Sequence, residues 1–291
     1  MSLRKRLLKG AKLAAPIVVA AREGEEGRRP DHGYLATAAG DPAATEHLHG
    51  LLGRPEGTPT GAALTVVAPG EDIEPIAPLL RERRAAERRS LIVLIGDPAS
   101  RARRERALTR DHRVEVSQIL HLNALDEEGE AAVMDAAALA LGDLAPAAAR
   151  ANPALRPAVA HRIVSQSSRR AGLVGALPLA GADMPALAYL QIRMVARLAV
   201  VYDRPITPER ALDALAIVGA GFGWRALGRA AVSAVPVAGW AAGGAVAFAG
   251  TRVVGETARA RLSSTHNLID AGALERVRPQ FERLVARLSR G

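Results

Sequence analysis

The chain has 291 residues, of which 49 % are hydrophobic and 24 % are charged. A chain of this length can bury about three quarters of the surface that its unfolded form exposes, so its core needs no disulfide or structural metal. Because it contains no cysteine, thiol nucleophiles, disulfides and thiolate metal sites are excluded. Its 39 basic residues outnumber the 30 acidic ones, but only 3 % of the residues are aromatic, which argues against a stacking surface for nucleic acid.

Residues 1–60 show little regular pattern. Near the start, lysines and apolar residues fall on different faces of a helix, as in helices that lie on an anionic lipid surface. A solvated tail and a cleaved signal are the alternatives. We therefore expect a basic tail and an irregular linker, with one short helix over residues 45–52. The lysines of this basic surface are Lys5, Lys9 and Lys12.

Three short apolar runs alternate with helical patterns between residues 61 and 145. The runs are Ala63–Ala68, a second that begins at Leu91 and a third that begins at Val116. An alanine-rich helix is predicted after the third, over Glu127–Leu141. Continuous apolar runs that alternate with helices are typical of a parallel sheet covered on both faces. The sequence thus predicts a small three-stranded parallel α/β domain.

The rest of the chain contains no strand pattern. Capping residues and prolines predict helices over Met184–Tyr202, Pro208–Gly228 and Val237–Leu262. The expected fold class is α/β plus all-α, with the α/β domain followed by a small-residue-rich helical domain. Its expected parts are a helical linker over 146–170, the helical domain over 171–262 and a C-terminal amphipathic helix over 263–291.

The turn after the first predicted strand differs from a phosphate-binding loop. It reads APGEDIEP, with one glycine, and Glu71 and Asp72 would repel a phosphate. The sequence has no G-x-x-x-x-G-K-[ST] motif and no lysine after Lys12. His121 lies in the third apolar run, where a core position is expected. We therefore predict no catalytic, cofactor-binding or metal-binding residue.

A stretch without charge, Ala230–Thr251, is 22 residues long. A helix of that length can cross a hydrocarbon core of about 30 Å, although a composition of alanine, glycine and valine weakens the case. G-x-x-x-G pairs let helices approach closely. One interpretation is a hairpin over residues 214–251 in or against a membrane, and the other is a tightly packed soluble bundle. The residues assigned to membrane contact or helix packing are Gly219, Gly223, Arg225, Arg229, Pro236, Gly239 and Gly243.

Two stretches, GADMPALAYLQIRMVARLAVVYDRPIT and AVPVAGWAAGGAVAFAGTRVVGETARARL, resemble the uncharacterised YcjF/GTPase-associated helical domain. This resemblance implies a bacterial module that occurs at the C-terminus of Ras-like and dynamin-like GTPases and in inner-membrane proteins. The residues that carry it are Asp183, Gln191, Met194, Tyr202, Pro236, Gly239, Thr251 and Gly255.

The three apolar runs are similar to the second half of a Ras-like G domain. Ile95–Pro98 stand where the guanine-reading N-K-x-D motif would be, and Asn123–Leu125 replace the S-A-[KL] loop. The resemblance therefore implies a degenerate G-domain remnant, to which we carry over no nucleotide-binding residue.

The favoured hypothesis is a non-enzymatic, membrane-associated module without a cofactor. In it, a pseudo-GTPase-like domain is fused to a helical domain that contacts membrane lipid or a partner protein, and the small-residue helix faces offer a route to homo-oligomers. The expected location is the cytoplasmic face of the inner (plasma) membrane, peripheral or integral. Two alternatives stay open: a GTP-binding protein with altered motifs, and a soluble scaffold whose arginine-rich helix, Arg101–Arg113, binds an acidic partner.

Overall fold

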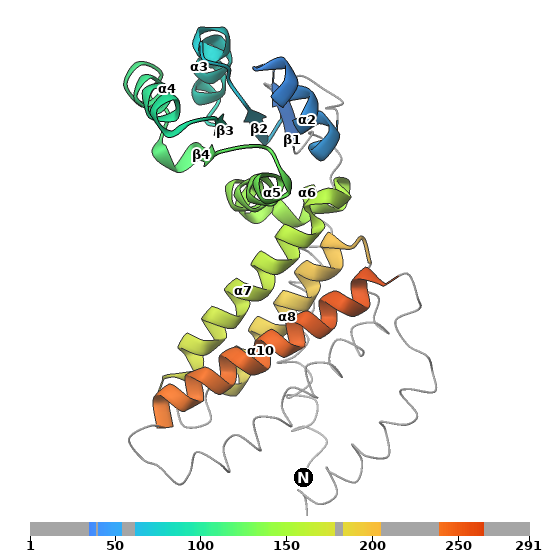
Figure 1. Cartoon of the computed structure of the whole chain (residues 1–291). Helices are drawn as coiled ribbons and strands as arrows, with labels where there is room; N and C mark the ends of the chain where they lie inside the picture. The colour runs from blue at the N-terminus through green and yellow to red at the C-terminus, as the bar shows by residue number, and fades with distance from the viewer. Residues whose placement is uncertain (1–34, 39, 54–61, 178–182, 205–238, 265–291) are drawn as a thin grey trace, which may run out of the picture.

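The computed structural model describes residues 35–38, 40–53, 62–177, 183–204 and 239–264. A small sheet with its helices forms one end of the molecule, and three long helices extend from it (Figure 1), so the expected combination of an α/β part and a helical part is confirmed. The strands are β1 (Leu35–Ala38), β2 (Leu64–Val67), β3 (Arg89–Ile95) and β4 (Ile119–Leu122). The α-helices are α2 (Pro42–Leu52), α3 (Ala77–Ala85), α4 (Pro98–Asp111), α5 (Glu127–Leu141), α6 (Ala145–Ala151), α7 (Arg156–Gly175), α8 (Asp183–Val201) and α10 (Gly239–Ser263).

The sheet has four strands, so the prediction of three was wrong. All four are parallel, and their order in the sheet is β1-β2-β3-β4. The additional strand, β1, lies in the segment expected to be irregular. Its four residues, LATA, include one large apolar side chain, so the segment shows no apolar run of the kind that predicts a buried strand. The third predicted strand begins at Ile119 rather than Val116, because residues 116–118 form a 3-10 turn.

Helices cover both faces of the sheet. Val67 and Ile92 pack with α3 and α4 on one face, and Val66 and Val93 pack with α2 and α5 on the other. Each β-α-β connection moves to the next strand in the same direction across the sheet. The hand of a connection therefore depends on which face its helix covers. Because α2 covers one face and α3 and α4 cover the other, the β1-α2-β2 connection has the opposite hand to the two connections that follow it.

Helices α7, α8 and α10 form a bundle that shares its core with the sheet. One apolar cluster includes Val93 of β3, Leu155, Leu198 of α8 and Val254 of α10. The core therefore continues from the α5 face of the sheet into the bundle. Helices α8 and α10 begin close to the residues predicted from the sequence.

Among the described residues, one helical run, 127–151, is long and apolar enough to cross a membrane by length and composition. This run comprises α5 and α6, and half of its most apolar window is buried. Val133, Ala137 and Leu141 belong to the shared core. Since a core helix of a soluble protein passes the same test, packing against the sheet accounts for much of this apolarity.

Candidate functional site

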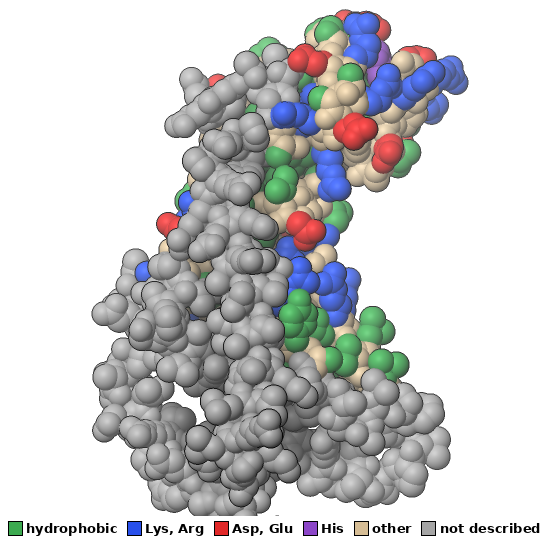
Figure 2. All heavy atoms as spheres, turned by 180° about the vertical axis from the view of Figure 1, so that it is seen from behind, with side chains coloured by type: hydrophobic (Ala, Val, Ile, Leu, Met, Phe, Trp, Pro, Cys, Tyr) green, Lys and Arg blue, Asp and Glu red, His purple; other side chains and the backbone are tan. Residues whose placement is uncertain are grey.

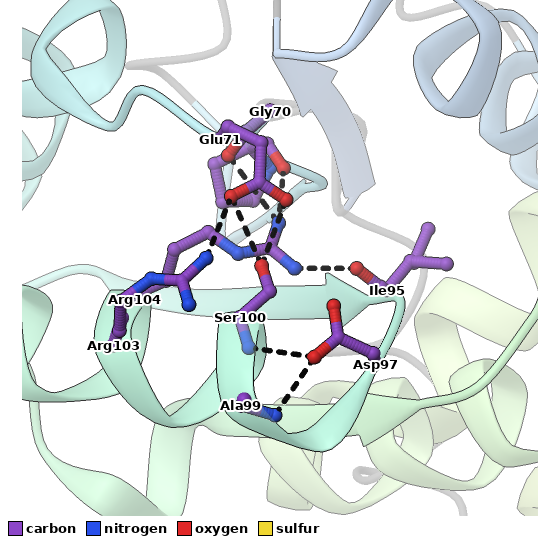
Figure 3. A network of polar contacts seen from close by, with 9 residues as sticks. Gly70, Glu71, Ile95, Asp97, Ala99, Ser100, Arg103 and Arg104 are labelled. Carbon is purple, nitrogen blue, oxygen red and sulfur yellow. Dashed lines mark hydrogen bonds and ion pairs between the residues drawn. The ribbon is translucent and has the colours of Figure 1, made fainter.

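The carboxyl ends of β2 and β3 form the edge at which parallel α/β sheets place their ligands. Strand β3 leads into Gly96, whose φ of 118° favours glycine. Asp97 then caps α4, because its carboxylate accepts hydrogen bonds from the backbone N–H groups of Ala99 and Ser100, each at 3.0 Å. This turn brings the start of α4 beside the turn that follows β2 (Figure 3).

Arg104 fills the edge between these two turns. Its side chain leaves α4 and is buried, with an exposed fraction of 6 %. The guanidinium donates to the carbonyl oxygens of Pro69 at 3.1 Å and of Gly70 at 3.3 Å, and it also donates to the carbonyl oxygen of Ile95 (Figure 3). Arg104 therefore ties α4 to the ends of both central strands.

Glu71 makes a second link across the same edge. Its carboxylate accepts hydrogen bonds from the Ser100 hydroxyl, at 2.7 and 3.0 Å, and lies 3.7 Å from Nη2 of Arg103. The sequence predicted that Glu71 would repel a phosphate here. In the structure this carboxylate, a neighbouring hydroxyl and the Arg104 guanidinium are all engaged with one another or with the backbone, so protein groups occupy the turns at the ends of β2 and β3.

Hydrogen bonding at this edge shifts the pKa of Asp97. The hydrogen bond from the Ser100 N–H is the main cause that lowers the pKa of Asp97 below its ordinary value. The carboxylate is therefore charged at neutral pH, where a negative charge at a helix N-terminus is favourable.

A second buried arginine, Arg83 of α3, holds the opposite end of the sheet. It is 1 % exposed and donates to the carbonyl oxygens of Ala62 and Ala63 and to the Ser90 hydroxyl, at 3.0, 3.3 and 3.1 Å. Burial, aided by the charge of Arg88, lowers the pKa of Arg83 to about 10. The group therefore stays charged at neutral pH.

Sequence reasoning missed both buried arginines. Arg83 and Arg104 lie in helices rich in exposed arginines, so composition does not distinguish them. One signal was present for Arg104: Ser100, Arg104 and Leu108, the buried residues of α4, are spaced four apart and therefore share one face.

A seam of glycines joins α7 and α10, which run antiparallel. A Cβ atom added to Gly175 would lie 2.5 Å from Cβ of Ala247, and one added to Gly243 would lie 2.7 Å from the Gly175 carbonyl oxygen. Gly172 and Gly244 face each other in the same way. Gly243 thus lies at a close contact between helices, and its neighbour there is Gly175 of α7.

A buried polar layer crosses the same bundle. Nε2 of Gln191 donates to Oγ1 of Thr251 at 3.1 Å, and both side chains are buried. Ser168 of α7 is also fully buried and lies at the same level, since Gly172 faces Gly244 and Val164 contacts Gly255. Each of the three helices therefore contributes one polar side chain to this layer.

Two histidines have contacts that the sequence did not predict. Nε2 of His47, on α2, lies 2.7 Å from Oε1 of Glu130. His121 was expected in the core, and this prediction was wrong: its side chain is 37 % exposed and lies 3.3 Å from Glu105. The reason is that β4 is an edge strand, which leaves part of its surface uncovered. Among the described residues, no group of three or more His, Asp and Glu side chains could hold a metal ion.

Several residues singled out in the sequence lie outside the described part of the chain. The helix predicted over Pro208–Gly228 and nearly all of the C-terminal helix are among them. Gly239 is within the description as the first residue of α10. The individual residues outside it are Lys5, Lys9, Lys12, Gly219, Gly223, Arg225, Arg229 and Pro236.

These observations define a class of protein: a small parallel α/β domain, with a buried arginine between the carboxyl ends of its central strands, that is joined to a bundle of closely packed helices. Residues 141–288 match the model of a family described as a domain of unknown function, DUF697. This match covers half of the chain, and the chain belongs to that family. No curated protein and no solved structure matches the chain.

Proposed function

We propose that this protein is a non-catalytic, membrane-associated module. In this proposal a shortened, pseudo-GTPase-like α/β domain supports the DUF697 helical domain, which contacts lipid or a partner protein at the cytoplasmic face of the inner membrane. The observation that carries the proposal is the position of Arg104, which occupies the sheet edge where a ligand of an α/β fold would bind.

The hand of the first connection supports the view that the α/β domain is shortened. Parallel β-α-β connections are almost always right-handed, yet α2 lies on the face opposite to α3 and α4. Loss of strands that once lay beyond the free edge of β1 accounts for this. With such strands in place, α2 would connect β1 to a strand on its outer side, and a later segment would bring the chain back to β2. Every connection could then be right-handed.

The composition of the bundle supports a role at a membrane. Arginines outnumber acidic residues on each of the three long helices, and α7 has no acidic residue at all. The glycine seam gives the close helix packing that is common in membrane helices. The resemblance to the YcjF-like helical domain points in the same direction.

Cell fractionation tests the proposal. We expect the expressed full chain to sediment with the membrane fraction and to remain there after a wash in high salt, because apolar contacts are insensitive to ionic screening. Recovery of the protein in the soluble fraction without detergent would contradict membrane association.

Calorimetry distinguishes the proposal from the main alternative, a GTP-binding protein with altered motifs. We expect no binding heat when the purified chain is titrated with millimolar GTP and magnesium, because the buried Arg104 occupies the space between the ends of β2 and β3 and the exposed Glu71 carboxylate beside it repels phosphate. Saturable heat with GTP would favour the alternative and overturn the non-catalytic interpretation.

A further inference from the structure

The end of the bundle farthest from the sheet has a core of its own. Ala171, Leu187 and Ala247 pack together there, one from each long helix. We call this end the bundle tip. It comprises three segments: 171–177, which is the end of α7 with the two residues after it, 183–192 of α8 and 239–251 of α10. The contact between Gly175 and Gly243 joins two of these segments directly.

The bundle tip contains almost no charge. Asp183, the first residue of α8, is the only charged residue in its three segments. Along each helix from the tip toward the sheet, the next charged residue is an arginine: Arg170 on α7, Arg193 on α8 and Arg252 on α10. An apolar end is therefore followed on all three helices by a basic residue.

These arginines lie near one level of the bundle. The hydrogen bond from Gln191 to Thr251 places Arg193 and Arg252 beside the same polar layer, and Arg170 follows Ser168 of that layer by two residues. Figure 2 shows basic side chains directly beside an apolar patch on this part of the molecule. We call this level of the three helices, with Arg169, Arg170, Arg193 and Arg252, the basic belt; the bundle tip lies beyond it.

Two leucines make the tip surface apolar. Leu173 is 72 % exposed and Leu177 is 53 % exposed, and they lie one turn apart on the face of α7 that also carries the exposed Arg169 and Arg170. Adjacent large apolar side chains left in water indicate a surface that is covered in use.

The length of the tip matches one leaflet of a bilayer. At a rise of 1.5 Å per residue, the belt is about 10 Å from Leu177 on α7 and about 20 Å from Gly239 on α10. Half of a hydrocarbon core is about 15 Å. The described length of the tip therefore suits entry into one leaflet.

We propose that the bundle tip inserts into one leaflet of an anionic membrane. Leu173 and Leu177 enter the hydrocarbon, while the exposed Arg169, Arg170 and Arg252 bind the phosphates of the headgroups. Guanidinium groups suit this role because they bind phosphate with two parallel hydrogen bonds. The inference rests on the proposed function, since it specifies the surface by which the protein meets the membrane. A bilayer fits this surface better than an acidic protein does. In a bilayer the anionic headgroups lie next to the apolar hydrocarbon, and on the protein the arginines lie next to the apolar leucines in the same order.

Vesicle sedimentation with the full chain tests the inference. We expect the wild type to sediment with vesicles of phosphatidylcholine and phosphatidylglycerol, and Leu173→Asp/Leu177→Asp to bind at least tenfold more weakly. The matched control is Leu139→Asp/Leu144→Asp, at leucines that are 54 % and 48 % exposed and lie outside the tip; it should bind like the wild type. All four side chains are exposed, and thermal unfolding of each variant verifies that it folds.

A fluorescent label gives an independent readout of insertion. Because the chain has no cysteine, Leu177→Cys can be labelled at one position with an environment-sensitive dye. We expect its emission to shift to the blue on anionic vesicles, and the dye on Leu139→Cys to show no shift. An unshifted dye at position 177 on vesicles that bind the protein would overturn the inference.

The outcomes separate the inference from the proposed function. Equal vesicle binding by the wild type and the Leu173→Asp/Leu177→Asp variant would overturn the inference and leave membrane association intact. A second result would also contradict the inference: loss of vesicle binding in Arg169→Glu/Arg170→Glu together with unchanged binding in Leu173→Asp/Leu177→Asp. The surface would then bind anions without inserting, as a surface for an acidic protein partner would. No binding of the wild type, together with its recovery in the soluble cell fraction, would overturn the proposed function itself.

Discussion

Arg103 and Arg104 are neighbours in α4 with opposite surroundings. The side chain of Arg103 is 64 % exposed, whereas Arg104 is buried and satisfies three backbone carbonyl groups. A surface ion pair such as Arg103–Glu71 contributes little to stability, but removing one partner of a buried polar network leaves the others unsatisfied.

We therefore expect Arg104→Met to lower the free energy of unfolding by about 2–4 kcal/mol, since methionine fills the space but donates no hydrogen bond. Arg103→Met is the control and should change it by less than about 0.5 kcal/mol. Urea unfolding of both variants measures the difference. Similar midpoints for the two would show that the Arg104 network is not important for stability.

The charge of Asp97, at the same edge of the sheet, makes the stability of the folded protein depend on pH. Hydrogen bonding lowers its pKa from 3.8, so its charged form stabilises the folded state above that pH, and this stabilisation is lost as the pH falls through the lowered pKa. Asp97→Asn keeps an acceptor at the helix cap but carries no charge. We expect the Tm difference between wild type and variant to be constant near neutrality and to shrink below about pH 4. Thermal unfolding at a series of pH values tests this, and a gap that stays constant in acid would contradict it.

At the scale of elements, the contact between α7 and α10 depends on glycine at particular positions. Gly175→Ala would place a Cβ 2.5 Å from Ala247 Cβ and 2.9 Å from the Gly243 carbonyl oxygen, so the helices must move apart. We expect a loss of about 1–3 kcal/mol. Gly250→Ala, in α10, meets nothing within 4 Å and should stabilise the protein by up to about 1 kcal/mol through helix propensity. Thermal unfolding of the two variants should therefore give shifts of opposite sign, and shifts of the same sign would argue against a close seam.

The polar layer offers a second test of the bundle. Thr251→Val removes the acceptor of Gln191 and leaves a buried amide unpaired, at an expected cost of about 1–2 kcal/mol. Gln191→Leu should cost less, because the Thr251 hydroxyl can bond to its own helix. In a double-mutant cycle measured by urea unfolding, the double variant should be more stable than the sum of the singles by about 1 kcal/mol. Strict additivity would mean that the hydrogen bond contributes nothing.

At the scale of the whole molecule, the shared core couples the sheet to the bundle. Residues of β2, β3, α5, α7, α8 and α10 belong to one apolar cluster, so neither part can unfold without exposing the surface of the other. Both tryptophans, Trp224 and Trp240, belong to the C-terminal half of the sequence, so tryptophan fluorescence is a separate probe from circular dichroism, which follows the helices of both parts.

We expect unfolding followed by tryptophan fluorescence and by far-ultraviolet circular dichroism to give the same midpoint. Arg104→Met, a change at the sheet, should move both transitions equally. Two separate transitions, or a fluorescence midpoint that ignores Arg104→Met, would show that the bundle unfolds independently.

Patterns within single elements could be predicted from the sequence with good accuracy. The helix predicted over Glu127–Leu141 has the same bounds in the structure, because Asp126 caps it and Gly142 ends it. The other three strands, β2, β3 and β4, were recognised by the apolar runs that contain them. β1 was missed because LATA has a single large apolar residue and forms no such run, and its pairing with β2 is a contact between distant parts of the chain.

The candidate site could not be predicted in the same way. The sequence alone determined that no phosphate-binding lysine follows Lys12, that two parts of different composition follow each other and that the helical part is rich in small residues. Only the tertiary structure decided which arginine of α4 is buried, which glycines meet across α7 and α10, and that three helix segments with Asp183 as their single charged residue lie together beyond the arginines of the basic belt. The physical reason is that burial and charge grouping depend on which elements face each other, whereas caps, periods and missing residue types are properties of neighbouring positions in the chain.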